Sequence, residues 1–211
     1  MNRLSPSLLD SFAYYNACQD EEKSLLLRSE ILDSLRGKPR QPNEAMQKGL
    51  DFEANVVLAC NNKYNNSGNV AYDCCVREIA TEVKGSRYQI HVARDMDGTL
   101  LHGFIDFLRA DQIYDVKTCG HYDVGKYLRR SQHLIYLYCM AEMNVWKFSY
   151  LVTDFQRVYR EDYAWHDNMY DELRSRIRDW YDYLCNDTEM RQAFEARDSG
   201  ETTDDILWSL D

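Results

Sequence analysis

Proline and glycine are scarce in this chain of 211 residues, which has 3 prolines and 9 glycines. It also has no long apolar run. The composition excludes collagen-like repeats and low-complexity disorder. A membrane-spanning helix needs roughly 20 consecutive apolar residues, so the sequence predicts none. The first residues also lack the basic, apolar and small-residue succession of a secretory signal. We therefore expect a cytoplasmic protein that does not enter a membrane.

Cysteine is present but in the wrong pattern for two common roles. The seven cysteines are an odd number, and none of them forms a Cys-x-x-Cys pair. Disulfide frameworks usually use an even number of cysteines, and zinc ribbons use paired ligands at short spacing. Reduced, mostly buried thiols are the interpretation that remains.

Positive charge is also in deficit. The chain has 25 Lys and Arg against 35 Asp and Glu, a formal net charge of −10. Proteins that bind polyanions through their overall field usually carry an excess of basic residues, so the net charge argues against this mode of binding. A local basic groove remains compatible with the composition, and carboxylates gathered to hold metal ions would themselves add negative charge.

The apolar content is high enough for a buried core. Hydrophobic residues make up 45% of the chain and charged residues 28%, which is typical of one globular domain. We expect this domain to span residues 1–197. The acidic remainder, 198–211, is predicted to be either a mobile tail or a docking segment.

Helical signals dominate the first third of the sequence. Ser5 followed by Pro6 is typical of a helix start, with an N-cap and a proline in the first turn. A second helix is predicted over 21–36, where Gly37 and Pro39 end it, and a third over 43–60.

The pattern then changes to alternation of apolar and polar residues. A hairpin is predicted from Tyr88 to Leu108 around the turn at 95–98. The remaining predicted elements are a strand at 112–118, a helix at 123–143, a strand at 145–152 and an amphipathic helix at 163–184. This order predicts an α/β fold with a mixed central sheet flanked by helices, and helical N-terminal and C-terminal segments.

Carboxylates and a lysine are clustered at two adjacent predicted strands. Asp115 and Lys117 are two residues apart, so they project from the same face of their strand. If the strands pair, Asp106 comes near Asp115, and two close carboxylates repel each other unless a cation lies between them. Mg²⁺ prefers such a small set of carboxylates. Each residue alone would also suit a solvated strand or turn, so the prediction rests on the set.

These residues resemble a known family. Asp106 followed by Asp115-Val116-Lys117 is similar to the signature of the PD-(D/E)XK nuclease superfamily, although Ile105 stands where that signature has proline. Its RecB-like and lambda-exonuclease-like branch also has a Gly-x-x-x-Glu helix, which 49–53 resembles, and a Gln-x-x-x-Tyr helix, which 132–136 resembles. The resemblance implies a restriction-endonuclease-like core.

The resemblance also implies a chemistry. In that branch the acids and one backbone carbonyl bind Mg²⁺, for which Mn²⁺ substitutes, and the lysine orients the attacking water and stabilises charge. The corresponding metal ligands here are Glu53, Asp106, Asp115 and the Val116 carbonyl, with Lys117 as the fourth catalytic side chain. A role for Lys117 as general base is the alternative.

Substrate contacts follow from the same resemblance and from local charge. Gln132 and Tyr136 are expected to hold the nucleic-acid strand, although Tyr136 is equally compatible with a core position. The resemblance of the N-terminal segment adds Ser5. Basic residues on or beside the helix that carries Gln132 are candidate backbone clamps, or otherwise part of a solvated helix face. They are Lys126, Arg129 and Arg130.

The resulting hypothesis is a magnesium-dependent DNA exonuclease of recombination, repair or phage DNA processing, in a bacterial or phage-infected cytoplasm. A structure-specific endonuclease or nickase, and a catalytically silent binding module, are the alternatives. Some members of the branch bind an iron–sulfur cluster through one early and three late cysteines. Cys185 is the only late cysteine here, so no such cluster is expected. The sequence has no P-loop motif, which predicts no use of ATP. Besides DNA, the expected partners are further copies of the chain in a ring, or a strand-annealing recombination protein.

Overall fold

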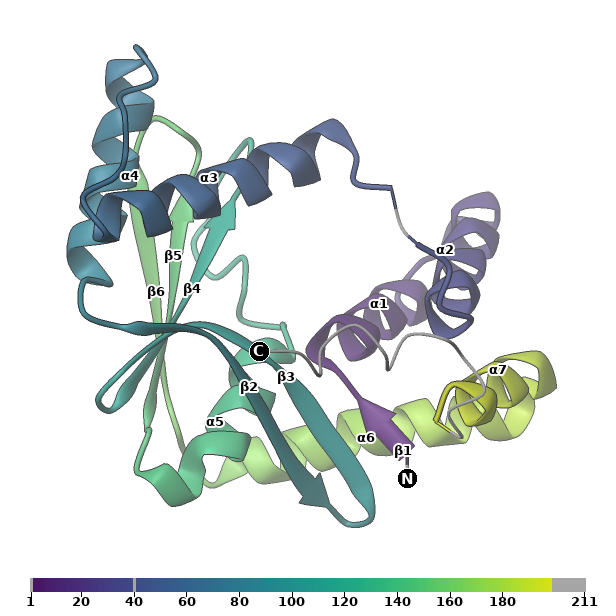
Figure 1. Cartoon of the computed structure of the whole chain (residues 1–211). Helices are drawn as coiled ribbons and strands as arrows, with labels where there is room; N and C mark the ends of the chain where they lie inside the picture. Colours follow the sequence, from purple (N-terminus) through teal and green to yellow (C-terminus); the bar gives the residue numbers. More distant parts are fainter. Residues whose placement is uncertain (1, 40, 199–211) are drawn as a thin grey trace. The chain divides into compact units, whose positions relative to one another are not determined.

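Residues 2–39 and 41–198 are described by a computed structural model of the chain (Figure 1). They form two compact units. The terminal unit contains the described residues up to Gln41, then Ala93–Gly103, and the described residues from His166 to Asp198. The central unit contains Pro42–Val92 and Phe104–Trp165.

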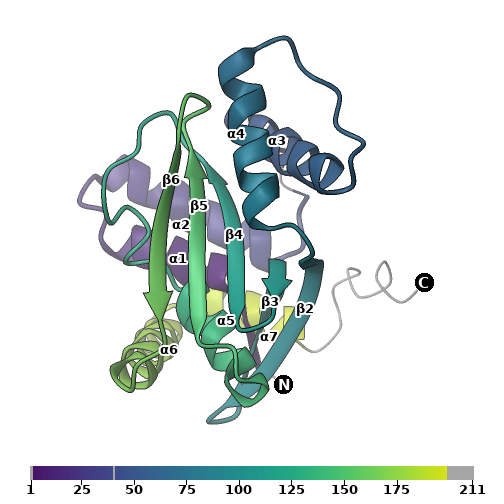
Figure 2. The ribbon, with the colours of Figure 1, turned by 90° about the vertical axis from the view of Figure 1, so that its left-hand side faces the viewer.

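A mixed sheet confirms the predicted fold class. The described strands are β1 (Asn2–Leu4), β2 (Arg87–Met96), β3 (Thr99–Arg109), β4 (Gln112–Thr118), β5 (Lys147–Thr153) and β6 (Val158–Ala164). Their order is β1-β3-β4-β5-β6, and β2 pairs with β3. The pairs β1–β3 and β4–β5 are parallel, whereas β3–β4 and β5–β6 are antiparallel. Figure 2 shows β4, β5 and β6 side by side.

The helices of the terminal unit begin largely where the sequence predicts. The first, α1 (Pro6–Asn16), is capped by the Ser5 hydroxyl, which accepts the Leu8 N–H at 3.3 Å. The second, α2 (Glu21–Leu35), is capped in the same way by Asp20. The apolar stripe of the helix predicted over 163–184 is confirmed in α6 (Asn168–Asn186), whose apolar side chains at helical spacing are all buried. The predicted start is wrong, because β6 extends to Ala164. An aromatic contact between Phe12 and Trp180, with centroids 5.2 Å apart, joins α1 to α6.

A partly buried carboxylate connects α2, α6 and α7 (Thr188–Asp198) in this unit. Arg28 donates to both oxygens of Asp187, at 2.8 and 2.9 Å, and the Tyr183 hydroxyl donates to Asp187 at 2.7 Å. Asp187 also accepts the Met190 N–H at 3.0 Å and so caps α7. The Arg28 guanidinium beside it holds the pKa of Asp187 well below its ordinary value. One side chain therefore ties three helices together.

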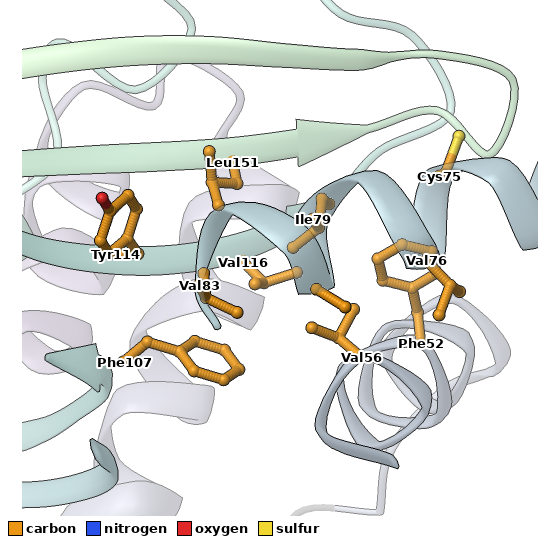
Figure 3. Packing of buried hydrophobic residues seen from close by; sticks show 11 residues of the cluster. Phe52, Val56, Cys75, Val76, Ile79, Val83, Phe107, Tyr114, Val116 and Leu151 are labelled. Carbon is orange, nitrogen blue, oxygen red and sulfur yellow. The ribbon is translucent and has the colours of Figure 1, made fainter. Parts of the chain in front are cut away.

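The central unit has its own apolar core between helices and sheet (Figure 3). The third predicted helix is confirmed as α3 (Glu44–Cys60), and its Phe52 and Val56 are fully buried. They pack with side chains of α4 (Val70–Glu82) and with Phe107, Tyr114, Val116 and Leu151 of the strands. The helix α4 was not predicted, although its buried residues repeat at helical spacing and Asn69 caps it.

The helix predicted over 123–143 is wrong at both ends. The observed α5 is Gln132–Met140, and Ala141–Met143 is a 3-10 turn. Before it the backbone makes successive turns, with bonds from Lys126 N–H to the Asp123 carbonyl and from Leu128 N–H to the Gly125 carbonyl. Gly125 has a φ of 77°, a left-handed conformation that interrupts a right-handed helix.

Besides α4, three further described elements were not predicted: β1, β6 and α7. The helix α7 overlaps the predicted acidic tail by one residue, Asp198. The Asp198 carboxylate accepts the Arg3 N–H at 2.6 Å. Residues 199–211 of that tail lie outside the described residues. None of the helices in the described part of the chain is both long and apolar enough to cross a membrane.

Because Asp187 ties three helices together, we expect its replacement to destabilise the protein measurably. Asp187→Asn keeps an acceptor for the Met190 N–H but removes the charge that Arg28 neutralises, so we expect the free energy of unfolding to fall by about 1–3 kcal/mol at pH 7. Because folding lowers the pKa of Asp187, its charge stabilises the folded protein fully at a pH above the unfolded-state pKa of about 3.9. This stabilisation is lost as the pH falls below that value.

Urea unfolding of both proteins at pH 7 and below pH 4 measures the difference. The matched control is Asp182→Asn, the same charge change at an exposed position of α6, with an expected effect within about 0.5 kcal/mol. Equal losses in the two variants, or a difference that does not shrink in acid, would contradict the prediction.

Candidate active site

The two predicted aspartates meet at adjacent strands of the central unit. Phe107 of β3 pairs with Tyr114 of β4, and Asp106 and Asp115 are the next residue on each strand. The Asp106 carboxylate accepts the Val116 N–H at 3.2 Å, while Asp115 is fully buried. The N–H and carbonyl of a strand residue point towards the same neighbouring strand, so the Val116 carbonyl lies on the Asp106 side.

Lys117 forms an ion pair with Asp115, as its position two residues along β4 predicts. The distance from Lys117 Nζ to Asp115 Oδ2 is 2.6 Å, and 32% of the lysine side chain is exposed. Burial lowers the pKa of Lys117, but the charges of Asp115 and Asp106 outweigh it, and the net pKa is above the ordinary value. Lys117 is therefore an ammonium group at neutral pH.

The residues of the Gln-x-x-x-Tyr segment support Asp115 from α5. Gln132 Nε2 donates to Asp115 Oδ1. The Tyr136 hydroxyl interacts with Gln132 and with the Phe104 backbone of β3, and Tyr136 is only 4% exposed. Of the two roles left open for Tyr136, the structure places it in the core, where it holds Gln132 and β3 in place.

Glu53 reaches the same area from α3 because that helix passes very close to β4. A Cβ atom at Gly49 would lie 3.0 Å from Thr118 Oγ1, so glycine permits the approach. Glu53 follows one turn later on the same helical face. Its Oε1 accepts Gln89 Nε2 at 3.0 Å. The spacing of the Gly-x-x-x-Glu segment thus has a packing reason.

The carboxylates influence one another strongly. Burial, followed by the charge of Asp115, raises the pKa of Asp106 well above its ordinary value. Burial and Asp115 raise the pKa of Glu53 as well. Such shifts mark an excess of negative charge in a poorly hydrated place, which a cation would relieve.

The donor set suits a cation held by few protein ligands. Within residues 2–39 and 41–198, no three Asp, Glu, His or Cys side chains are gathered closely enough to hold a metal ion, so Glu53 does not complete a ready-made triad. Mg²⁺ is usually bound through one or two carboxylates, with waters and phosphate oxygens filling the other positions. Asp106, Asp115 and the Val116 carbonyl meet that smaller requirement. Asp115 Oδ2 is buried and has its ion pair with Lys117 but no aligned hydrogen bond.

The other predicted substrate residues are more scattered. The basic residues Lys126, Arg129 and Arg130 are exposed, and they lie on the turns before α5, not on the helix. Lys126 donates to the His121 carbonyl. Ser5 belongs to the terminal unit, where its hydroxyl caps α1.

Two buried residues of the central unit were missed. Tyr127 is buried, its ring stacks on Tyr150 with centroids 4.8 Å apart, and burial raises its pKa to about 12. Glu161 of β6 is 8% exposed and accepts the Tyr127 N–H at 3.3 Å and the Tyr163 hydroxyl at 2.6 Å. Glu161 alternates with Tyr159 and Tyr163, a strand signal that could have revealed β6. Nothing comparable marks Tyr127.

Comparisons with known proteins place this arrangement in a class of folds. No protein-family model and no curated protein sequence matches the chain. Solved structures do match it, and they show an α/β fold with a mixed sheet that is shared with exonucleases.

The particular neighbours include two structures of the alkaline exonuclease LHK-Exo from Laribacter hongkongensis, one of them in complex with dAMP. The dAMP complex is 12% identical, with a TM-score of 0.53, and the match covers 94% of this chain and 93% of that one. The other LHK-Exo structure is 10% identical, with a TM-score of 0.51 over the same shares. A provisionally assigned exonuclease from Eubacterium rectale is 13% identical, with a TM-score of 0.52, covering 93% of this chain and 82% of its own. At these identities the likeness shows the fold alone.

The close approach at Gly49 predicts a coupling between two residues. Gly49→Ala alone should fail to stabilise α3, because the new methyl group presses on Thr118 Oγ1. In a Thr118→Ala background the same change should stabilise the protein by about 1 kcal/mol, the usual gain from replacing a helical glycine. Denaturant unfolding of the four proteins measures the difference. An equal gain in both backgrounds would show that α3 and β4 are not in tight contact there.

Proposed function

We propose that the protein is a divalent-metal-dependent nuclease of the PD-(D/E)XK type that hydrolyses phosphodiester bonds in DNA, acting as an exonuclease. The observation that carries the proposal is the meeting of Asp106, Asp115 and Lys117 on two neighbouring strands, in a fold that exonucleases share. Clustered carboxylates beside a lysine have no packing advantage, because burying charge costs free energy.

In this proposal Asp106, Asp115 and the Val116 carbonyl hold Mg²⁺ or Mn²⁺, and Glu53 borders them with further negative charge. A divalent cation bound there supplies polarisation of the scissile phosphate and a lowered pKa for the attacking water. Gln132 keeps Asp115 in position, and Tyr136 in turn fixes Gln132. The carboxylates are thus oriented before substrate arrives, which avoids reorganisation during the reaction.

Lys117 has the role of a cation. Its raised pKa keeps the ammonium group protonated at neutral pH, so it donates hydrogen bonds to the attacking water or to a phosphate oxygen and stabilises the developing negative charge. A general base would need a neutral amine, which the neighbouring carboxylates disfavour.

DNA is the substrate that the surroundings favour. The exposed turns before α5 carry Lys126, Arg129 and Arg130, and basic side chains of this kind contact the phosphate backbone without reading sequence. One structural neighbour was determined with dAMP, a deoxynucleotide, which supports a deoxynucleotide strand as the ligand here. The proposal also includes a contact between Ser5 and the DNA strand. It includes assembly as a ring of subunits, or with a recombination protein.

Cleavage assays test the proposal. Purified protein is incubated with end-labelled linear duplex, linear single strand and closed circular DNA, in Mg²⁺, Mn²⁺ or EDTA. Metal-dependent loss of linear DNA alone is the expected result. Asp115→Asn should abolish it, and Lys117→Met should lower kcat about 10²- to 10³-fold, the usual cost of losing one charge-stabilising donor.

The chain provides a matched control pair. Asp111 and Lys147 form an exposed ion pair at 3.1 Å in the same unit, so Asp111→Asn and Lys147→Met make the same chemical changes away from the site. Both should cleave like wild type, with circular dichroism confirming the fold of all four variants. Cleavage of circular DNA would favour an endonuclease. Metal-independent cleavage, full activity of Asp115→Asn, or no cleavage by folded wild type would refute the proposal.

A further inference from the structure

An aromatic side chain lies beside the acids on the same face of β3. The even-numbered residues of this strand are partly exposed, whereas Gly103, Ile105 and Phe107 are buried. Phe104 and Asp106 therefore project from one face, roughly 6.6 Å apart along the strand. Phe104 is 45% exposed, a large apolar area next to a cluster of charges.

The position of Phe104 is fixed from two sides. The ring of His91, an exposed residue of β2, lies against it with centroids 5.0 Å apart and planes inclined by 49°. The backbone of Phe104 interacts with the Tyr136 hydroxyl, the group that also holds Gln132. The aromatic pair is thus connected to the same network that orients Asp115.

The direction along the strands places this pair towards the lysine. Because β3 and β4 are antiparallel, the step from Asp106 to Phe104 runs in the same direction as the step from Asp115 to Lys117. If a nucleic-acid strand has its scissile phosphate at the acids and Lys117, an adjacent nucleotide of that strand would therefore lie at the Phe104 ring. An isolated exposed phenylalanine is common and has no special meaning, but this one adjoins a phosphate-handling site.

We propose that Phe104, with His91 packed beside it, forms a stacking platform for a nucleobase next to the scissile phosphate. The proposal rests on the proposed function and adds its substrate class, a nucleic-acid strand whose base at this position is unstacked from its neighbours. Aromatic rings stack on every base, so the platform is tolerant of sequence. It favours single strands and frayed ends, in which a base is already free to stack on protein.

A binding experiment in EDTA tests the platform without requiring cleavage. Single-stranded DNA carries the fluorescent base 2-aminopurine at one of the first three positions from either end, and stacking quenches its fluorescence. For wild type we expect quenching at one of these positions. Phe104→Leu should remove it and weaken binding about 5- to 100-fold, the range for loss of one base stack. Phe104→Tyr should restore both.

Trp146→Leu is the matched control, since Trp146 is 44% exposed and lies immediately before β5, beside the end of β4 that is opposite to Lys117. It should change neither quenching nor affinity. Quenching that persists in Phe104→Leu, absence of quenching at every position in wild type, or an equal loss in Trp146→Leu would overturn the platform.

Cleavage in Mg²⁺ adds a second, independent readout. Replacing the base at the quenched position by an abasic analogue should raise KM for wild type while kcat changes little, and should have no effect on KM for Phe104→Leu. If wild type cleaves DNA but the abasic substitution raises KM equally in both proteins, the platform fails and the nuclease stands. If wild type binds with Phe104-dependent quenching but never cleaves, the nuclease fails and the platform stands.

Discussion

The central unit depends on the burial of one charged group, the carboxylate of Asp115. A carboxylate with no exposed surface must find compensation within the protein, because removing it from water costs several kcal/mol. Lys117 supplies an opposite charge on the same strand, and Gln132 supplies a hydrogen-bond donor from α5. Asp106 adds a like charge, which keeps the balance negative. The site is therefore prepared for a cation by the same arrangement that makes it expensive to fold.

The packing around the acids explains why unremarkable residues matter. Gly49 lets α3 approach Thr118 of β4, and this brings Glu53 to the border of the site. Tyr136 is buried and connects Gln132 to the backbone of Phe104. The Gly-x-x-x-Glu and Gln-x-x-x-Tyr segments thus position the elements and side chains that surround the acids. The exposed ring of Phe104 lies on the same face and extends that surface beyond the charged centre.

Most of the candidate site could be predicted from the sequence, because it depends on strand alternation and on helical spacing. Asp115 and Lys117 share a face since they are two residues apart, and Gln132 and Tyr136 share one since they are four apart. The segment 123–131 could not be predicted in the same way. Its apolar and basic residues suit a helix, but the left-handed backbone at Gly125 and the burial of Tyr127 against Tyr150 turn it into consecutive turns. The edge strand β6 does carry a local signal, the alternation of Tyr159, Glu161 and Tyr163, but only its pairing with β5 shows that this short segment is a strand.

The sequence by itself determined the class of fold, the residues that carry charge to the site and the three N-terminal helices, because these follow from local periodicity, capping and turn residues. Only the tertiary structure decided how those residues are used. It buried Tyr136, assigned Gln132 to Asp115, kept Glu53 out of a three-carboxylate cluster and left Phe104 exposed beside Asp106. The physical reason is that burial and contact depend on which distant segments pack together, and local sequence patterns do not record that choice.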